Sequence, residues 1–363
     1  MYRLVQRRGI IGLFCLLFVA SSVVPGWAQK DNRFEVSKNL DIFNSLLKEV
    51  EMFYVDSVDV DKTVQRGIEA MLAGLDPYTE YYPEQKTEEL SLMTTGEYGG
   101  IGSLIRQRNN EGGVMIAEPT EGMPADLAGL KPGDLILAID TIDVSKATNS
   151  RVSELLKGVP NTKMVLTIQR PGEKKPRKFE ITRKQITTPQ VTYYGVKNDS
   201  IGYIYLKAFT IKSAQEVKEA FLDLKKNHNI KSLVLDLRGN GGGVLEGAVQ
   251  IVGMFVPKGS EVLSTKGKIK QWDRTYRTST EPLDTVMPLA ILINGGTASA
   301  AEIVSGSLQD MDRAVLVGQR SFGKGLVQAP RDLPYNGKVK ITMSKYYIPV
   351  SYTHLTLPTN SRV

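Results

Sequence analysis

One stretch of the chain, residues 291–328, limits its fold and chemistry more than any other. It begins inside an apolar run, PLAILIN at residues 288–294, which predicts a short buried strand. Two glycines follow, and the apolar period of residues 300–311 then predicts a helix. Ser299 therefore lies at the N-terminus of a helix, where backbone N–H groups are unpaired and the helix dipole is positive. Such a position suits the stabilisation of an oxyanion.

A serine hydroxyl becomes a nucleophile when a base lies beside it. The chain has two histidines: His228 lies in a polar helix end, and His354 lies in a C-terminal segment of foreign character. Lys324 lies between two glycines and is the alternative base, because burial lowers the pKa of an amine. Ser-Lys pairs are an established variant of the Ser-His-Asp triad. Taken alone, these residues also fit an interpretation in which Ser299 caps a helix and Lys324 occupies an exposed turn.

Three motifs in order resemble the C-terminal processing peptidases, also called tail-specific proteases. They are DLRGNGGG at residues 236–243, TASAAE at 297–302 and SFGKGLVQ at 321–328. The resemblance extends from about residue 39 to residue 349. It implies a serine peptidase of family S41 with an embedded PDZ domain. It also implies that Ser299 is the nucleophile, Lys324 the general base and Gln328 the residue that orients the lysine.

The glycine motif at 236–243 lies where a predicted strand leads into a helix, so its backbone N–H groups could bind an anion. A phosphate-binding loop is disfavoured because no Gly-Lys-Ser/Thr follows. The resemblance implies that the amide of Gly242 or of Gly243 joins that of Ser299 or Ala300 in an oxyanion hole. The sequence leaves open which glycine donates.

Residues 96–185 predict a compact β-rich domain. YGGIG at 98–102, followed by ADLAGLKPGD at 125–134, resembles a PDZ domain, which binds a peptide as an additional strand. Gly100, Ile101 and Gly102 match the loop whose backbone N–H groups capture a C-terminal carboxylate. Glycine is needed there because the backbone must approach the carboxylate closely.

From residue 200 onward, strands and helices alternate, which predicts a parallel α/β core with sites at its strand ends. The expected fold class is α/β within an α+β multidomain chain. An N-terminal helical region at 29–95 and the PDZ-like domain at 96–185 precede a serine protease core at 186–349, which resembles the ClpP and crotonase folds. Apolar spacing in residues 39–54 predicts a helix with one buried face.

Residues 75–81, LDPYTEY, resemble the segment that ends the N-terminal helical region in this family. The resemblance implies that the segment helps in dimerisation or packs against the protease core. Packing alone is an equally good interpretation of these residues.

The two ends of the chain carry separate expectations. In residues 1–28, Arg3, Arg7 and Arg8 precede an apolar run that contains the one cysteine, Cys15, and the segment predicts a secretory signal peptide. We therefore expect a periplasmic or otherwise extracytoplasmic protein, associated with the membrane if the segment stays uncleaved. Residues 350–363 resemble a translated sequencing adapter, so we expect a truncated core whose native sequence departs after Pro349.

Together these features predict an exported serine endopeptidase that binds protein C-termini and cleaves nearby. Its partners would be protein and peptide substrates with free C-termini, and a homodimer stays open. A catalytically inactive PDZ scaffold is the alternative, although the set of Ser299, Lys324 and Gln328 is intact. A crotonase-like acyl-CoA enzyme is disfavoured by the predicted export. The formal charge of +7 falls to +4 without Arg3, Arg7 and Arg8, and that charge is too mild and too scattered to favour nucleic acid. No metal cluster or cofactor motif leads us to expect a cofactor.

Overall fold

The computed structural model describes residues 32–108 and 112–349 of the chain. The predicted signal peptide and the predicted adapter-derived tail therefore lie outside the described residues. The chain is divided into two compact units, Met1–Ala70 and Met71–Val363. The predicted segment boundaries near residues 95 and 185 stay predictions.

The first unit holds helix α2 (Arg33–Phe53) and most of α3 (Val60–Ala73). The apolar period correctly predicts that α2 is a helix, but the expectation that one of its faces is buried is wrong. None of its residues is buried, and Phe43 and Leu46 are exposed. A periodic pattern places apolar side chains on one side of a helix without supplying the surface that covers them. Among the described residues, no helix is long and apolar enough to cross a membrane.

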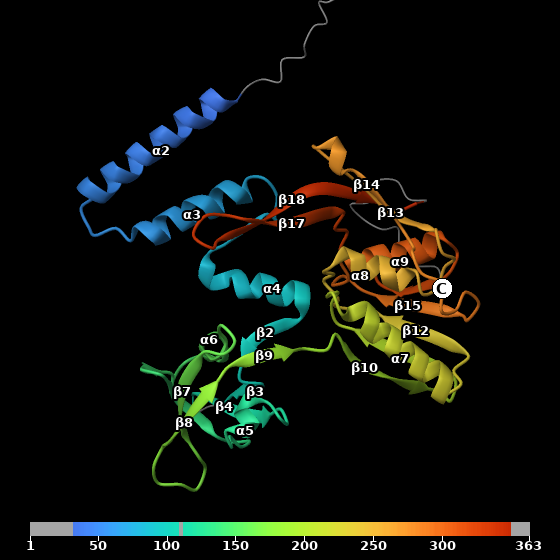
Figure 1. The fold of residues 1–363 in the computed structure, drawn as a ribbon, viewed down its shortest axis with the longest axis horizontal. Coiled ribbons are helices and arrows are strands. Elements are labelled where there is room, and N and C mark those ends of the chain that lie inside the picture. Colours follow the sequence, from blue (N-terminus) through green and yellow to red (C-terminus); the bar gives the residue numbers. More distant parts are fainter. Residues whose placement is uncertain (1–31, 109–111, 350–363) are drawn as a thin grey trace, which may run out of the picture. The chain divides into compact units, whose positions relative to one another are not determined.

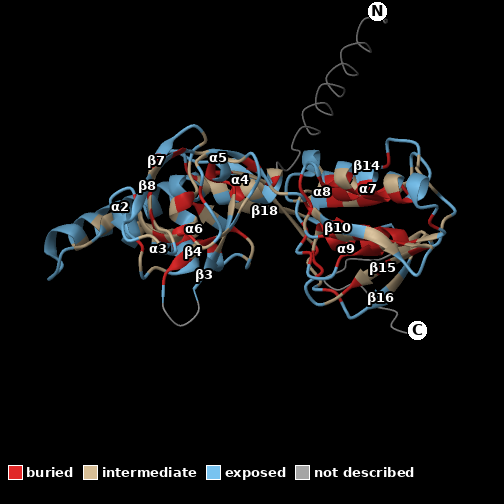
Figure 2. Ribbon diagram, turned by 90° about the horizontal axis from the view of Figure 1, so that it is seen from below, coloured by how far each residue is buried: buried red, intermediate tan, exposed pale blue. Residues whose placement is uncertain are grey.

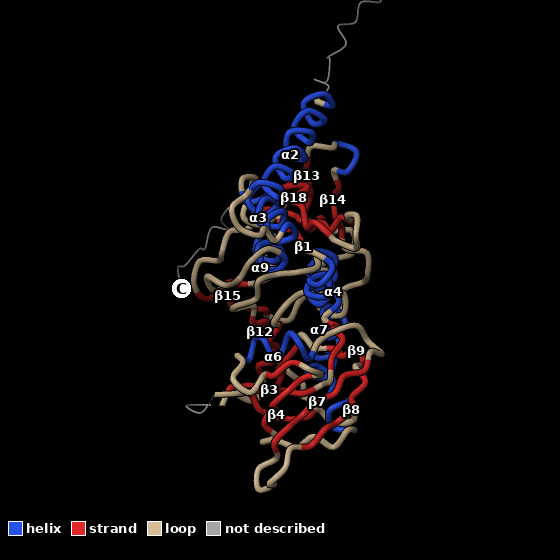
Figure 3. The backbone as a smooth tube through the Cα atoms, turned by 90° about the vertical axis from the view of Figure 1, so that its left-hand side faces the viewer, coloured by secondary structure: helices blue, strands red, loops and turns tan. Residues whose placement is uncertain are grey.

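One sheet of the second unit is built from six strands in the order β3-β4-β5-β7-β8, with β6 paired to β5 (Figure 3). The strands are β3 (Ser103–Gln107), β4 (Val114–Pro119), β5 (Leu135–Ile139), β6 (Ile142–Asp143), β7 (Lys163–Gln169) and β8 (Arg177–Thr182). In β7 every second side chain, Met164, Leu166 and Ile168, is buried, as expected for a sheet with one covered face. Strand β3 lies at the edge of this sheet.

Two short helices accompany this sheet, α5 (Pro124–Leu127) and α6 (Asn149–Leu156). Strands β2 (Glu97–Gly100) and β9 (Lys184–Thr187) pair with each other in a separate two-stranded ladder. The prediction that this part of the chain is rich in β-strands is therefore confirmed.

A second sheet has the order β10-β11-β12-β15-β16 (Figure 1). Its strands are β10 (Val191–Lys197), β11 (Ile201–Leu206), β12 (Ser232–Asp236), β15 (Leu289–Ile293) and β16 (Val315–Gly318). All neighbours from β11 to β16 are parallel, and β10 is antiparallel to β11. The connections include helices α7 (Ser213–Asn227), α8 (Leu245–Val252) and α9 (Ala300–Asp310). This alternation confirms the predicted α/β core.

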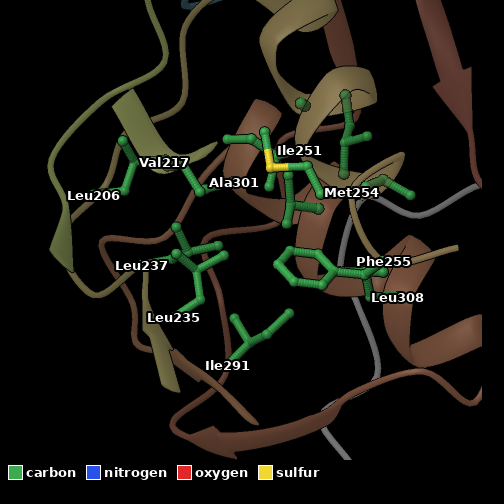
Figure 4. Close-up of a cluster of buried hydrophobic side chains, with 14 of the residues drawn as sticks. Leu206, Val217, Leu235, Leu237, Ile251, Met254, Phe255, Ile291, Ala301 and Leu308 are labelled. Carbon is green, nitrogen blue, oxygen red and sulfur yellow. The ribbon is translucent and has the colours of Figure 1, made fainter. Parts of the chain in front are cut away.

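The main hydrophobic core lies between these helices and strands, where the buried residues of Figure 2 concentrate. Figure 4 shows Leu235 and Ile291 from the strands facing Phe255 and Leu308. The rings of Phe221 and Phe255 meet edge to face, with centroids 5.5 Å apart. Each fully buried side chain of this size contributes about 1.5–3 kcal/mol, so this core fixes the strand ends that carry the candidate site.

A third sheet joins segments that are far apart in sequence. Its path is β1-β18-β13-β14, and β17 pairs with β18. The strands are β1 (Glu80–Tyr82), β13 (Glu261–Gly267), β14 (Arg274–Arg277), β17 (Leu326–Asp332) and β18 (Lys338–Tyr347). Between β1 and β2 come the short 3₁₀ helix η1 (Glu84–Lys86) and α4 (Thr87–Thr95), and η2 (Lys270–Trp272) lies between β13 and β14. Pairing of β1 with β18 brings residues 76–82 beside the strands that follow Lys324.

Candidate active site

Ser299 lies at a sharp turn between β15 and α9. It is the N-cap of α9, with φ 55° and ψ −117°, an unfavourable backbone conformation for a residue with a side chain. Its neighbours Ala298 and Ala300 are buried, whereas Ser299 is partly exposed. A strained strand-to-helix turn of this kind presents a serine hydroxyl at the edge of a parallel sheet. The structure therefore places Ser299 where the sequence predicts it.

Glu302, which is not among the predicted site residues, connects this turn to the loop that contains Lys324. Its carboxylate is buried and accepts four hydrogen bonds. One oxygen accepts from the Ser299 N–H and the Lys324 N–H, both at 2.8 Å. The other accepts from Ser321 Oγ at 2.7 Å and from the Gly323 N–H at 2.6 Å. Hydrogen bonds to a charged group each contribute about 1.5–3 kcal/mol, so this carboxylate holds the two segments together.

A sequence signal for Glu302 was present. Ser299 and Glu302 are three residues apart at the start of an apolar helix, which is the spacing of a capping box. The capping box accounts for the Ser299 bond alone. The bonds to residues 321–324 depend on the tertiary fold.

Lys324 lies in the loop between β16 and β17. Tyr346 fastens this loop, because its hydroxyl donates to the Lys324 carbonyl at 2.6 Å and its N–H donates to the Gly325 carbonyl at 3.1 Å. The same hydroxyl lies 3.5 Å from the Ser299 carbonyl oxygen. Burial raises the pKa of Tyr346 well above its usual value, so the hydroxyl remains a donor.

The Lys324 side chain is directed at an aromatic ring. Its Nζ lies 4.4 Å from the centroid of the Tyr78 ring. Burial lowers the pKa of Lys324, and the nearby charge of Lys340 lowers it further, whereas Glu80, Asp76 and Glu302 oppose the shift. In the described part of the chain, Lys324 Nζ has no hydrogen bond with Ser299 Oγ. The structure thus brings the backbones of Ser299 and Lys324 together and leaves their reactive atoms unbonded.

Gln328 lies on β17 and faces β18. Its side-chain amide donates to Thr342 Oγ1 at 3.0 Å, across a register in which the two residues are paired. Within the described residues it forms no hydrogen bond with Lys324. Its expected role in orienting the lysine stays a prediction.

The glycine loop passes directly over the Ser299 turn. A Cβ atom on Gly242 would lie 2.8 Å from Ser299 Cβ and 2.9 Å from the Ala300 nitrogen, and the φ of Gly242 is 93°. The Gly242 N–H donates to Asn240 Oδ1 at 2.9 Å. Gly243 is exposed, and among the described residues neither its N–H nor that of Ala300 has a protein acceptor. The Gly242 N–H is thus already bonded, and the expected pairing of a glycine amide with Ala300 in an oxyanion hole stays a prediction.

Asp236 and Arg238 hold the start of this loop. The Asp236 carboxylate accepts from the Arg238 N–H and Nε, each at 2.9 Å, and from the Tyr203 hydroxyl at 2.6 Å. Burial opposes its ionisation, but the bonds from Arg238 and Tyr203 keep the pKa of Asp236 below its usual value. At the other end, the Ala298 N–H donates to the Asn240 carbonyl at 2.9 Å. The glycine loop and the Ser299 turn are thus one bonded structure.

The predicted peptide-binding residues line a separate pocket that is open to solvent. Gly100, Ile101 and Gly102 form one side of it, together with residues of β3, and residues of α6 form the other. In the described structure, the N–H groups of Ile101 and Gly102 donate to no protein acceptor. Lys157 adds a positive charge at the pocket, 5.3 Å from the centroid of the Tyr98 ring. Strand β3, which borders this pocket, is an edge strand and so has backbone groups that no neighbouring strand of the sheet pairs.

Of the two histidines, one lies within the described residues and the other does not. The side chain of His228 is 51% exposed at the end of α7, as its polar surroundings predict, and His354 lies outside the described residues. Across residues 32–108 and 112–349, no group of three or more His, Cys, Asp or Glu side chains is arranged to hold a metal ion.

Comparisons with known proteins agree with one another. Residues 200–355 match the model of peptidase family S41, and residues 115–170 match a PDZ domain model. A carboxy-terminal-processing protease of Bartonella bacilliformis is 35% identical over 337 residues, which cover 92% of this chain and 75% of the relative. A probable CtpA-like serine protease of Staphylococcus aureus is 33% identical over 315 residues, which cover 86% of this chain and 62% of the relative.

The chain thus spans between three fifths and about three quarters of the length of these relatives. Among solved structures, a photosystem II D1 C-terminal processing protease is similar to it. That protein is 29% identical, with a TM-score of 0.46, and the match covers 85% of this chain and 82% of the other.

Proposed function

This chain belongs to peptidase family S41, a family of serine-type peptidases, and from that premise we propose that it is an exported endopeptidase that binds protein C-termini and cleaves with Ser299 and Lys324. The observation that carries the proposal is the joint position of the two residues. The buried carboxylate of Glu302 bonds the backbone N–H of both. The N–H group of Ala300, next to Ser299, and that of Gly243, next to Gly242, have no protein acceptor among the described residues.

In the proposed reaction, the neutral amine of Lys324 removes the proton from Ser299 Oγ as the oxygen attacks the scissile carbonyl carbon. The carbonyl oxygen becomes an oxyanion and accepts hydrogen bonds from the Ala300 and Gly243 N–H groups. The ammonium of Lys324 then protonates the leaving amine, and water hydrolyses the acyl-enzyme. The lowered pKa of Lys324 supports its role as a base, because more of the amine is neutral near pH 7.

Selection of substrates falls to the PDZ domain. A chain added along β3 would bring its terminal carboxylate to the unpaired N–H groups of Ile101 and Gly102. The positive charge of Lys157 lies at the same pocket. We propose that proteins with free, unstructured C-termini are the substrates and that the pocket holds the terminus while Ser299 cleaves elsewhere in the chain.

Export is part of the proposal and rests on residues 1–28, whose charged start and apolar run are typical of a signal peptide. Expression with an epitope tag followed by cell fractionation tests it. Recovery of the protein in the cytoplasm with residues 1–28 intact would contradict export.

The proposed activity is tested with the chain and its Ser299→Ala variant on an unfolded protein. The unchanged chain should cleave and the variant should not, because the acyl-enzyme cannot form. Equal cleavage by both would remove Ser299 from the mechanism. If neither cleaves while a peptide with a free C-terminus still binds, the inactive PDZ scaffold is the better description.

Recognition is tested with one peptide in two forms, with a free and with an amidated C-terminus. Amidation removes the terminal charge and its charge-assisted hydrogen bonds, so binding should weaken roughly tenfold or more. Equal affinity for the two forms would reject C-terminal recognition without touching the peptidase proposal.

A further inference from the structure

The Lys324 side chain has a neighbour that the reaction does not require. Its Nζ lies 4.4 Å from the centroid of the Tyr78 ring, within the range in which an ammonium is attracted to an aromatic face. In the described residues, the same atom forms no hydrogen bond with Ser299. The lysine is therefore held by a ring that comes from a part of the chain more than two hundred residues earlier.

The turn that carries Tyr78 is well fixed. The Asp76 carboxylate accepts from the Tyr78 N–H at 2.8 Å and the Thr79 N–H at 2.9 Å. It also accepts from Thr79 Oγ1 at 2.8 Å. Three bonds to one carboxylate close the turn and fix the backbone from which the Tyr78 ring projects.

The same turn also reaches Gln328. The Thr342 N–H donates to Thr79 Oγ1 at 3.1 Å, and Thr342 Oγ1 accepts from the Gln328 side chain at 3.0 Å. Pairing of β1 with β18 continues this connection. Two of the three predicted catalytic residues, Lys324 and Gln328, are thus linked to residues 76–79. Within the part of the chain that the structure describes, Ser299 forms no hydrogen bond with either of their side chains.

We propose that Tyr78 is a positioning residue that holds the Lys324 ammonium in a resting place away from Ser299, and that substrate cleavage requires the lysine to leave the ring. The inference rests on the proposed function, in which Lys324 is the base. A cation over an aromatic face is stabilised as a cation, so Tyr78 opposes the neutral form that the reaction needs. The charged groups near the amine are Asp76, Glu80, Glu302 and Lys340, and Tyr78 is the aromatic neighbour.

The test compares Tyr78→Leu with Tyr78→Phe and with a control, Tyr81→Leu. Leucine keeps an apolar volume over the amine but removes the aromatic face, whereas phenylalanine keeps the face and removes the hydroxyl. Tyr81 lies on β1 in the same segment, and in the described structure its ring contacts no cation. Melting of each variant shows whether it folds.

The first readout is independent of activity. Acetylation of Lys324 by acetic anhydride is followed against pH by mass spectrometry, and its midpoint reports the amine's titration. In Tyr78→Leu the midpoint should fall, giving about fivefold to thirtyfold more neutral amine at a fixed pH on the acid side. The chain, Tyr78→Phe and Tyr81→Leu should share one midpoint. An unchanged midpoint in Tyr78→Leu, or an equal change in Tyr78→Phe, would overturn the proposal.

The second readout is cleavage of an unfolded protein against pH. In Tyr78→Leu, kcat should rise several-fold on the acid side with KM unchanged. A merely structural role would lower kcat and leave the pH profile in place, which overturns the proposal. The acetylation midpoint can fall in Tyr78→Leu although neither the unchanged chain nor any variant cleaves. In that case the peptidase proposal fails, and the proposal that Tyr78 holds the Lys324 ammonium stands.

Discussion

At the scale of single residues, Glu302 is the point on which the candidate site depends. Only 1% of its surface is exposed, and a buried carboxyl group is tolerated only when hydrogen bonds replace its lost hydration. Its four donors come from residues on both sides of the site. The carboxylate is therefore a structural requirement for the approach of the Lys324 loop to Ser299.

We expect Glu302→Gln to lose about 1–3 kcal/mol of stability, because one amide NH₂ group would face donors that it cannot bond. Cleavage should fall as well, since the Ser299 turn and the Lys324 loop lose their common acceptor. Urea unfolding and the cleavage assay measure the two effects. The control is Glu281→Gln on the surface, where the side chain is 79% exposed and the change should be within about 0.5 kcal/mol. Equal stability of the two variants would show that the bonds to Glu302 are not needed.

Lys324 makes the free energy of unfolding depend on pH. Its pKa is lowered from 10.5 chiefly by burial, so the unfolded chain binds this proton more tightly than the folded chain does. Between the lowered pKa and 10.5, stability should therefore rise with pH, and below that window the buried ammonium destabilises the fold.

We accordingly expect Lys324→Met to be more stable than the unchanged chain near pH 7, with a difference that shrinks as the pH approaches 10.5. Denaturant unfolding at several pH values measures it, with the exposed Lys268→Met as the control without such a trend. A difference that grows with pH would mean that the pKa of Lys324 is raised. The same variant should not cleave.

At the scale of elements, the glycine loop and the N-terminus of α9 act as one unit. Their approach leaves no room for a side chain at Gly242, where a Cβ would lie 2.7 Å from the Ala298 carbonyl oxygen. The neighbouring Gly241 has nothing within 4 Å of its Cβ position. The two glycines are adjacent in sequence but differ in backbone conformation and in what the fold brings beside them, since only Gly242 has a positive φ.

Gly242→Ala should reduce cleavage by roughly a hundredfold or more, because the loop must withdraw and take one oxyanion donor with it. It should also cost more than about 1 kcal/mol of stability, since its φ of 93° is unfavourable for alanine. Gly241→Ala should be close to the unchanged chain in both measurements. If both variants cleave normally, the glycine loop lies outside the mechanism.

At the scale of the whole molecule, the two units differ in how they are stabilised. The second unit contains the buried cores, whereas α2 in the first unit has no buried residue. Most of the stability of a protein helix comes from tertiary packing of its apolar face, and α2 has no buried residue to supply it.

Amide hydrogen exchange should therefore be much faster in α2 than in α9, whose residues are largely buried. Exchange followed by mass spectrometry compares peptides from the two helices in the same sample. Protection of α2 equal to that of α9 would indicate that a second molecule covers its apolar face.

The sequence alone determined the fold class, the PDZ domain and the family. It could do so because the periods of strands and helices and the local motifs depend on residues that are close together in sequence. It placed Ser299 at a helix start, as the structure confirms. It could not indicate that Tyr78 meets Lys324 or that Thr79 bonds Thr342. These depend on strand register between segments as much as 263 residues apart, and an apolar period such as that of α2 does not say what covers it. Helices, strands and short motifs are determined by residues close together in sequence. The candidate site also needs contacts between distant segments, which form only when the sheets have formed.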